Sequence, residues 1–170
     1  MDTITVKVPA TSANCGPGFD SLGLALELYN TFTFTPDKTA SANTYTFSGF
    51  DADTLAKEDQ TYNLVGQAMQ AVFQQASSEP IYGNVHSETV IPPSRGLGSS
   101  STAIVAGLLL ANRLLAKPLT THELLVLAND IEDIRIMWRL LYWVILCVPS
   151  MIRKNFYIQP WPYRKSYFSP

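Results

Sequence analysis

Apolar and polar side chains alternate along several short stretches of the chain, with the period of a half-buried β-strand. Ile4, Val6 and Val8 alternate with polar residues, which predicts a strand over residues 3–9. The same strand pattern predicts further strands at residues 22–28, 31–35, 44–47 and 84–90. Tyr29-Asn30 suits a turn, and we predict that it separates the strand at 22–28 from the strand at 31–35.

Helical spacing of apolar residues begins in the second third of the chain. It extends over residues 62–75, which predicts an amphipathic helix with Asp59 or Thr61 as its N-cap. A second helix, rich in Ala and Leu and almost free of charge, is predicted from the glycine- and serine-rich segment at residues 92–101 to Ala116. A helix of this composition must be largely buried.

A third helix is predicted from a capping box. Pro118 ends the second helix, and Thr120 with Glu123 has the spacing at which a hydroxyl and a carboxylate cap a helix, here one that runs toward Glu132. The order of elements is therefore strands, helix, strand, helix and helix. This order predicts a main domain of the α+β class with a mixed sheet.

Charge and cysteine content exclude several classes of function. The 170 residues carry a net charge of -2, and Lys and Arg form no basic stripe before the last quarter of the chain, so no nucleic-acid partner is expected. Cys15 and Cys147 lack the spacing of a disulfide framework or a zinc site. Residues 1–9 lack the basic and apolar regions of a signal peptide. A cytoplasmic protein that does not enter a membrane is expected.

The composition changes abruptly in the last quarter of the chain. Every Asp and Glu lies within residues 1–133, whereas residues 134–170 contain none of them and all three tryptophans. The apolar segment at residues 140–148 is much shorter than the roughly 20 residues needed to span a bilayer. We therefore expect one domain over residues 1–132 and no domain over residues 133–170.

The segment from Pro92 to Thr102 has the strongest chemical signal. Gly96 and Gly98 allow the backbone to approach a ligand closely, serines follow, and the positive dipole end of the next helix favours an anion. The loop lacks the lysine of a Walker A motif and the third glycine of a GxGxxG motif. Two interpretations fit this pattern: a phosphate-binding loop, or a plain turn that caps a helix.

Two ordered motifs resemble those of one kinase superfamily. The string Pro-Pro-Ser-Arg-Gly-Leu-Gly-Ser-Ser-Ser at residues 92–101 resembles the second signature motif of the GHMP kinases. The string from Val8 to Leu26, with Asn-Cys-Gly-Pro-Gly-Phe-Asp at its centre, resembles the N-terminal motif of their homoserine kinase branch. The resemblance implies a GHMP kinase N-terminal domain of the ribosomal protein S5 domain 2-like fold, with the C-terminal domain missing.

The same resemblance implies an activity and roles for single residues. The activity is transfer of a phosphoryl group from ATP to L-homoserine in threonine biosynthesis, with Mg²⁺, and intact relatives are often homodimers. Asn14 would approach the reacting hydroxyl as the catalytic residue, and Asp20 would bind the substrate ammonium, in place of plain turn and loop-capping roles. Ser100 and Glu132 would hold Mg²⁺, unless Glu132 is only a solvated helix end. The ATP-binding residues would be Ile91, Pro92, Pro93, Ser94, Arg95, Gly96, Leu97, Gly98, Ser99, Ser100 and Ser101.

The family pattern stops after Glu132. Homoserine kinases typically continue Gly-His-Pro-Asp-Asn-Val-Ala-Pro-Ala-Leu-Leu-Gly, and no residue of 133–144 matches this string in register. When residues 133–144 are back-translated with a G placed before them and read in the shifted frame, degenerate codons permit the whole string. We therefore expect a lost base after Glu132, an out-of-frame tail, and little or no kinase activity in the chain as written.

Two other functions remain open. The chemistry could be that of another GHMP kinase, acting on a sugar or an isoprenoid precursor, although the loop from Asn14 to Asp20 argues against it. Alternatively, the chain could be a non-catalytic fragment that at most binds nucleotide weakly. Turnover of a different alcohol would identify the first, and weak nucleotide binding without turnover would identify the second.

Sequencing the gene across the codons for Glu132 and Asp133 tests the expected base loss. An additional base at this junction should restore the Gly-His-Pro-Asp-Asn frame if the loss arose in sequencing. A base that is missing from the gene itself would make the chain a broken copy. A codon series that restores no family string in either neighbouring frame would contradict the expectation.

Overall fold

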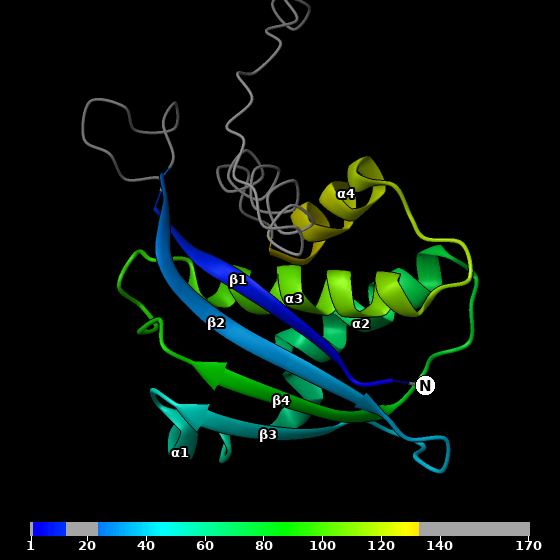
Figure 1. Cartoon of the computed structure of the whole chain (residues 1–170), viewed down its shortest axis with the longest axis horizontal. Helices are drawn as coiled ribbons and strands as arrows, with labels where there is room; N and C mark the ends of the chain where they lie inside the picture. The colour runs from blue at the N-terminus through cyan, green and yellow to red at the C-terminus, as the bar shows by residue number, and fades with distance from the viewer. Residues whose placement is uncertain (1, 13–23, 133–170) are drawn as a thin grey trace, which may run out of the picture.

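The computed structural model describes residues 2–12 and 24–132. One mixed β-sheet runs through these residues, and helices pack against one of its faces (Figure 1). The predicted α+β class and the predicted order of strands, helix, strand, helix and helix are confirmed, with one additional short helix. In chain order the elements are β1 (Ile4–Ser12), β2 (Leu24–Pro36), β3 (Thr44–Gly49), α1 (Ala52–Leu55), the 3₁₀ turn η2 (Gln60–Tyr62), α2 (Leu64–Gln75), β4 (Gly83–Thr89), α3 (Ser99–Leu114) and α4 (Thr121–Glu132).

The sheet has the strand order β1-β2-β4-β3. β2 is antiparallel to both of its neighbours, whereas β3 is parallel to β4, so the sheet is mixed as predicted. Phe32 and Phe34 of β2 point into the core at 2% and 0% exposure, and they alternate with threonines on the opposite face. Burial of each ring contributes about 1.5–3 kcal/mol. The alternation that predicted the strands therefore also determines which face of the sheet the helices cover.

The predicted turn at Tyr29-Asn30 is wrong. β2 is one continuous strand of 13 residues, and Asn30 lies near its middle with only 1% of its side chain exposed. Asn favours turns because its side chain bonds to nearby backbone. Here the side chain instead bonds to residues 60, 61 and 72 positions further along the chain. A long-range partner has therefore replaced the local one that the prediction assumed.

The start of α2 also differs from the prediction. Asp59 accepts a hydrogen bond from the backbone N–H of Thr61 at 2.9 Å, but it caps the short turn η2 and not the helix. The N-cap of α2 is Asn63, whose side-chain oxygen accepts from the backbone of Val65 and Gly66 at 3.1 and 3.3 Å. Asn63 has an extended backbone, so the helix begins at Leu64, and Tyr62, the first residue of the predicted helix, belongs to η2.

The capping box at the start of α4 is confirmed. The Glu123 carboxylate accepts from the backbone N–H and the hydroxyl of Thr120, both at 2.7 Å, and the Thr120 hydroxyl accepts from the backbone N–H of Glu123 at 3.3 Å. These hydrogen bonds stabilise the ionised carboxylate and lower the pKa of Glu123. The reciprocal hydrogen bonds fix the start of α4 after the loop that follows α3. From this start, α4 packs against both α2 and α3.

The two faces of the sheet differ in chemistry. α3 packs over β1 and β2, and most of its middle residues are buried, as its lack of charge predicts. The opposite face carries hydroxyls, such as those of Thr5 and Thr33 at 3.1 Å from each other.

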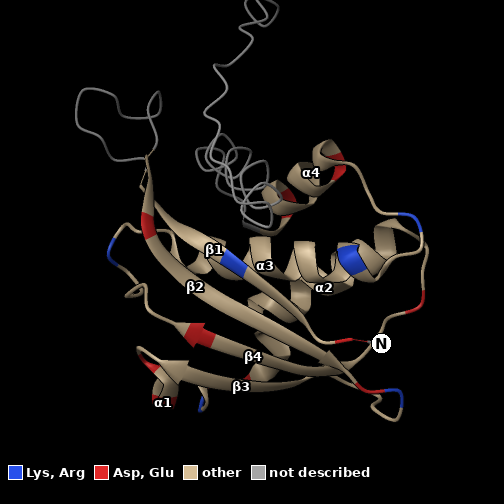
Figure 2. Ribbon diagram, in the orientation of Figure 1, with Lys and Arg blue, Asp and Glu red and all other residues tan. Residues whose placement is uncertain are grey.

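Charged residues are spread singly over the elements in Figure 2. Among residues 2–12 and 24–132, none of the helices reaches the length and apolarity of a membrane-spanning segment.

Gly107 marks the closest approach of α3 to α2. A Cβ atom at this position would collide with the backbone carbonyl of Val65 and would lie 2.7 Å from the Cβ of Ala68. We expect Gly107→Ala to destabilise the fold by about 1–3 kcal/mol in urea unfolding, because neither neighbour can move independently of α2. This loss would occur although alanine has the higher helix propensity.

Gly66→Ala is the matched comparison for Gly107→Ala. A Cβ at Gly66 would meet the hydroxyl end of the Tyr45 side chain, which can rotate away. Gly66→Ala should therefore destabilise the fold less than Gly107→Ala does. Equal or greater stability of Gly107→Ala than of the unmodified chain would contradict the proposed close packing.

Candidate functional site

The loop between β4 and α3 has an unusual backbone. Ser94, Gly96 and Gly98 have φ angles of 56°, 68° and 67°, in the left-handed region that most side chains avoid. Gly98 is also the N-cap residue of α3, and no side chain caps that helix end. The backbone conformation therefore favours glycine at positions 96 and 98, as predicted. These positive φ angles lead the chain into the first turn of α3.

Three sets of hydrogen bonds fix this loop to the domain. The backbone N–H of Thr11, at the end of β1, donates to the carbonyl of Leu97 at 3.1 Å. The hydroxyl of Ser99 donates to the carbonyl of Ile91 at 3.2 Å and closes the loop on itself. The buried side-chain amide of Asn30 bonds to both ends of the loop, at Val90 and Ile91 on one side and at Thr102 on the other. The loop is thus held by β1, β2 and α3 together.

The side of the loop at Gly96 is open. A Cβ built on Gly96 would have no heavy atom of the described residues within 4 Å, so these residues leave the backbone there accessible to a ligand. The positive end of the α3 dipole lies at Gly98 and Ser99, and the exposed Arg95 is the one charged residue of the loop. Open backbone, a helix N-terminus and a cation together suit an anion such as a phosphate group.

The structure places the predicted ATP-binding segment as one loop, but its residues differ in what they can offer. Ile91 is 0% exposed, and its backbone N–H and C=O bind Asn30 and Ser99, so its contribution is to support the loop. The backbone from Gly96 to Ser101 is the part at the helix end. Asn14 and Asp20, the predicted substrate residues, lie outside the described residues.

Ser100 and Glu132 supply oxygen donors of the type that Mg²⁺ prefers. Ser100 lies in the first turn of α3, and Glu132 is the last residue of α4, which turns back over α3 in Figure 1. No group of three or more His, Cys, Asp or Glu side chains gathers anywhere in the described part of the chain. Hydroxyl and carboxylate oxygens are among the ligands that Mg²⁺ accepts, and the ion usually takes its other ligands from phosphate and water.

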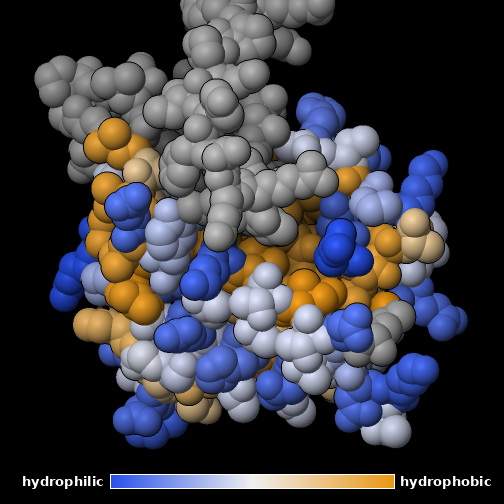
Figure 3. Space-filling view, in the orientation of Figure 1, coloured by the Kyte–Doolittle hydropathy of each residue, from blue (hydrophilic) through white to orange (hydrophobic). Residues whose placement is uncertain are grey.

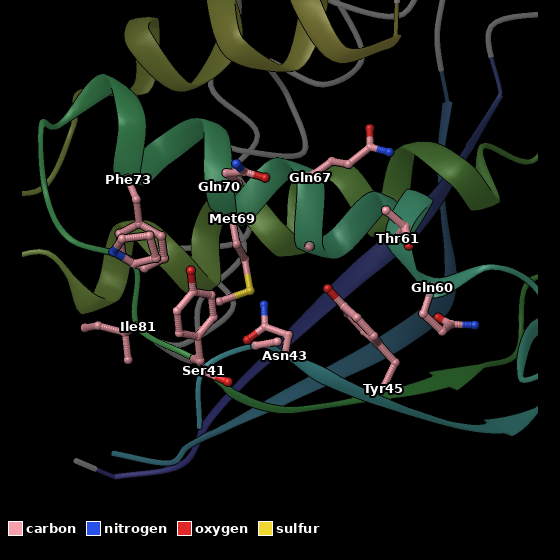
Figure 4. Close-up of a pocket in the computed structure, with 14 residues that line it drawn as sticks. Ser41, Asn43, Tyr45, Gln60, Thr61, Gln67, Met69, Gln70, Phe73 and Ile81 are labelled. Carbon is pink, nitrogen blue, oxygen red and sulfur yellow. The ribbon is translucent and has the colours of Figure 1, made fainter. Parts of the chain in front are cut away.

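A separate cavity of about 440 Å³ lies between β3, α2 and residues 80–82 (Figure 4). Asn43 extends toward Met69 of α2, and the Tyr45 side chain reaches α2 with its hydroxyl beside Gly66. None of the described residues that line the cavity is charged, and none belongs to the 91–101 loop. It is therefore distinct from the 91–101 loop, and its neutral lining does not suit a phosphate.

Sequence reasoning missed Asn30 and Thr102 as parts of the site. Both side chains are buried beneath the loop, at 1% and 2% exposure, and they are joined by a hydrogen bond of 2.9 Å. The signal was a polar residue in the middle of an alternating apolar run, where Asn30 occupies the position of an inward-facing side chain between Leu28 and Phe32. An asparagine at such a position must find buried partners.

Apolar side chains are exposed beside the site. Leu24 and Leu26 at the beginning of β2 are 56% and 36% exposed, and Val90 just before the loop is 47% exposed. On the face shown in Figure 3, apolar residues gather along this side of the molecule and over the middle of α3. The surroundings of the loop are thus less polar than the outer face of the sheet.

The chain matches known kinases over the part that contains this site. The family model for the GHMP kinases N terminal domain matches residues 63–136. A homoserine kinase from Crocosphaera subtropica (strain ATCC 51142 / BH68) is 44% identical over 133 residues, which cover 78% of this chain and 42% of the relative. A homoserine kinase from Synechococcus sp. (strain CC9311) is 47% identical over 131 residues, with coverage of 76% and 41%.

A solved structure is similar over the same region. The crystal structure of homoserine kinase from Cytophaga hutchinsonii ATCC 33406 matches with a TM-score of 0.63 and 26% sequence identity, covering 78% of this chain and 41% of that chain. The chain thus spans about two fifths of the length of the curated relatives that it matches.

Gly96→Asn tests whether the open side of the loop receives an anion. Asn tolerates positive φ, and its Cβ would lie more than 4 Å from the other described heavy atoms, so the fold should keep its thermal stability. The added side chain would occupy the open space, and we expect the affinity for inorganic tripolyphosphate to fall about tenfold or more in calorimetric titration, since each 1.4 kcal/mol corresponds to a factor of ten.

The control for Gly96→Asn is Ser77→Asn at the end of α2, where φ is 49°. This variant introduces the same side chain at another left-handed position away from the loop, and it should bind tripolyphosphate like the unmodified chain. Unchanged binding by Gly96→Asn would contradict an anion site at this loop.

Proposed function

We propose that this chain, whose described residues form the N-terminal domain of a GHMP kinase, is the ATP-binding part of a homoserine kinase, which transfers a phosphoryl group from ATP to L-homoserine. The resemblance inferred from the two sequence motifs is confirmed by relatives that are 44% and 47% identical. The observation that carries the proposal is the glycine-rich loop, held open to an anion at the N-terminus of α3.

The proposed site for the ATP phosphates is the backbone from Gly96 to Ser101. Its support is the positive φ of Gly96 and Gly98, the open space beside Gly96 and the dipole of α3. Phosphoryl transfer has a loose transition state in which positioning and charge stabilisation do most of the work. The loop can supply both without a general base, and Arg95 adds a positive charge at its exposed edge.

Asn14 and Asp20 are proposed to bind the amino acid. Their segment leaves β1 at Ser12 and rejoins β2 at Leu24, and these two residues are paired in the sheet. The neighbouring Thr11 is bonded to Leu97 of the loop, so both ends of the segment lie beside the phosphate site. A carboxylate at Asp20 would attract the homoserine ammonium, and the Asn14 amide would orient its hydroxyl toward the phosphate.

Ser100 and Glu132 are proposed to hold Mg²⁺. When bound, the ion would neutralise charge on the phosphate oxygens, as in other phosphoryl-transfer enzymes. Both residues offer hard oxygen donors. Ser100 belongs to the same helix turn as the phosphate loop.

We further propose that residues 133–170 are an out-of-frame tail and that the domain ends at residue 132. The support is the codon compatibility described above and the lengths of the matched stretches, 133 and 131 residues. We also propose a cytoplasmic location, because residues 1–132 contain a single cysteine, Cys15, which suits a reducing compartment.

Activity assays on two forms of the protein test the proposal. One form is the chain as written, and the other is the product of a gene with one G inserted after the Glu132 codon. The second form should phosphorylate L-homoserine with ATP and Mg²⁺, whereas the first should have little or no activity. Turnover of only a sugar or an isoprenoid alcohol would contradict homoserine as the substrate. Homoserine turnover by the chain as written at the rate of an intact relative would contradict the out-of-frame tail.

Asp20→Asn in the frame-restored protein tests the ammonium site. Removal of the charge should raise KM for homoserine by about tenfold or more, which corresponds to loss of one charge-assisted contact. KM for ATP should change little. Asp37→Asn, in the turn after β2, removes an equal charge elsewhere and should leave both values unchanged. An unchanged KM for homoserine in Asp20→Asn would remove Asp20 from the substrate site.

A further inference from the structure

Asn30 continues the sheet at the point where its backbone ladder stops. The last regular pair between β2 and β4 is Thr31 with Glu88. Beyond it, the side-chain oxygen of Asn30 accepts hydrogen bonds from the backbone N–H groups of Val90 and Ile91, at 2.8 and 3.0 Å. Asn30 therefore takes the place of a strand partner for the first residues that lead into the loop.

The same side chain also holds the other end of the loop. The Asn30 NH₂ group donates to the hydroxyl of Thr102 at 2.9 Å, and that hydroxyl donates to the carbonyl of Ser99 at 2.7 Å. The backbone N–H of Thr102 donates to the carbonyl of Gly98 at 3.0 Å. A continuous chain of bonds thus runs from β2 into the first turn of α3.

Asparagine is well suited to this position. It provides an acceptor for two backbone N–H groups and a donor for a hydroxyl, without carrying a charge. Aspartate would lack the donor and would place a negative charge beneath an anion site. Leucine has a similar shape, but it would leave the buried N–H of Ile91 without its partner, which is costly.

We infer that Asn30 is a positioning residue for phosphate binding. It acts through Ile91 and Thr102, holding the two ends of the 91–101 loop at the separation that gives the loop its anion-binding shape, and it does not touch the ligand itself. The identity of the ligand as ATP rests on the proposed function, whereas the control of loop shape does not.

Two measurements on the full chain test this role. The first is the dissociation constant for ATP with Mg²⁺, and the second is the rate at which trypsin cuts after Arg95 without ligand. Arg95 is exposed in the loop, so its cleavage reports how well the loop keeps its shape. Asn30→Ala removes three hydrogen bonds, and loss of one alone corresponds to a factor of up to about ten. We therefore expect ATP binding to weaken and cleavage to accelerate, each by about tenfold or more.

Asn112→Ala is the matched control. Asn112 is also an asparagine with two bridging bonds, to the backbone N–H and carbonyl of Leu119 at 2.7 and 3.2 Å, but it lies near the opposite end of α3. This variant should lose thermal stability and keep both the ATP affinity and the cleavage rate at Arg95. A difference between the two variants therefore separates loop positioning from general stability.

Thr102 provides a second pair of variants in case Asn30→Ala does not fold. Thr102→Val removes the hydroxyl that links Asn30 to Ser99 and should repeat both effects, whereas Thr102→Ser keeps the hydroxyl and should restore them. Unchanged cleavage at Arg95 in Asn30→Ala or in Thr102→Val would overturn the inference. If the unmodified chain does not bind ATP, the ATP-binding half of the proposed function fails, and the cleavage rates alone decide the role of Asn30.

Discussion

The buried amide of Asn30 is the contact on which the rest of the site depends. It replaces a strand partner for Val90 and Ile91 and reaches Thr102 at the start of α3, so that one side chain joins the sheet to both ends of the loop. Between those ends the chain holds three residues at positive φ, a conformation that persists only where its surroundings enforce it. Loss of this contact would leave the bonds from Thr11 and Ser99 in place, but it would detach both ends of the loop from the side chain of β2 that joins them.

The architecture around this contact explains why the loop faces outward. The apolar rings of β2 are buried beneath the helices, and α3 lies over β1 and β2 with nearly all of its middle buried. The helix therefore cannot shift without disturbing the core, and its positive end is presented at a fixed place beside the end of β1. Rigid support of this kind means that a bound anion need not organise its own site.

The sequence contained most of this fold, but not the contact at its centre. Local signals succeeded where the partners are local: Thr120 and Glu123 are three residues apart, and their reciprocal bonds were predictable from spacing alone. They failed at Asn30, whose partners are 60 to 72 positions away, and at Asn63, where a short 3₁₀ turn precedes the helix. The glycines of the loop were predicted from their chemistry, whereas the bonds that hold the loop depend on packing. The substrate residues Asn14 and Asp20 were assigned by resemblance alone and stay predictions.

The central claim is that the 91–101 loop, and not the neutral cavity between β3 and α2, receives the phosphates of ATP. The most direct measurement is a titration of the ¹⁵N-labelled chain with ATP and Mg²⁺, followed through the backbone amide resonances. The account predicts that the largest changes occur at Gly96, Gly98 and Ser99, with little change at Asn43 and Gln70 in the cavity. Changes confined to the cavity, or no changes at saturating ATP, would contradict it.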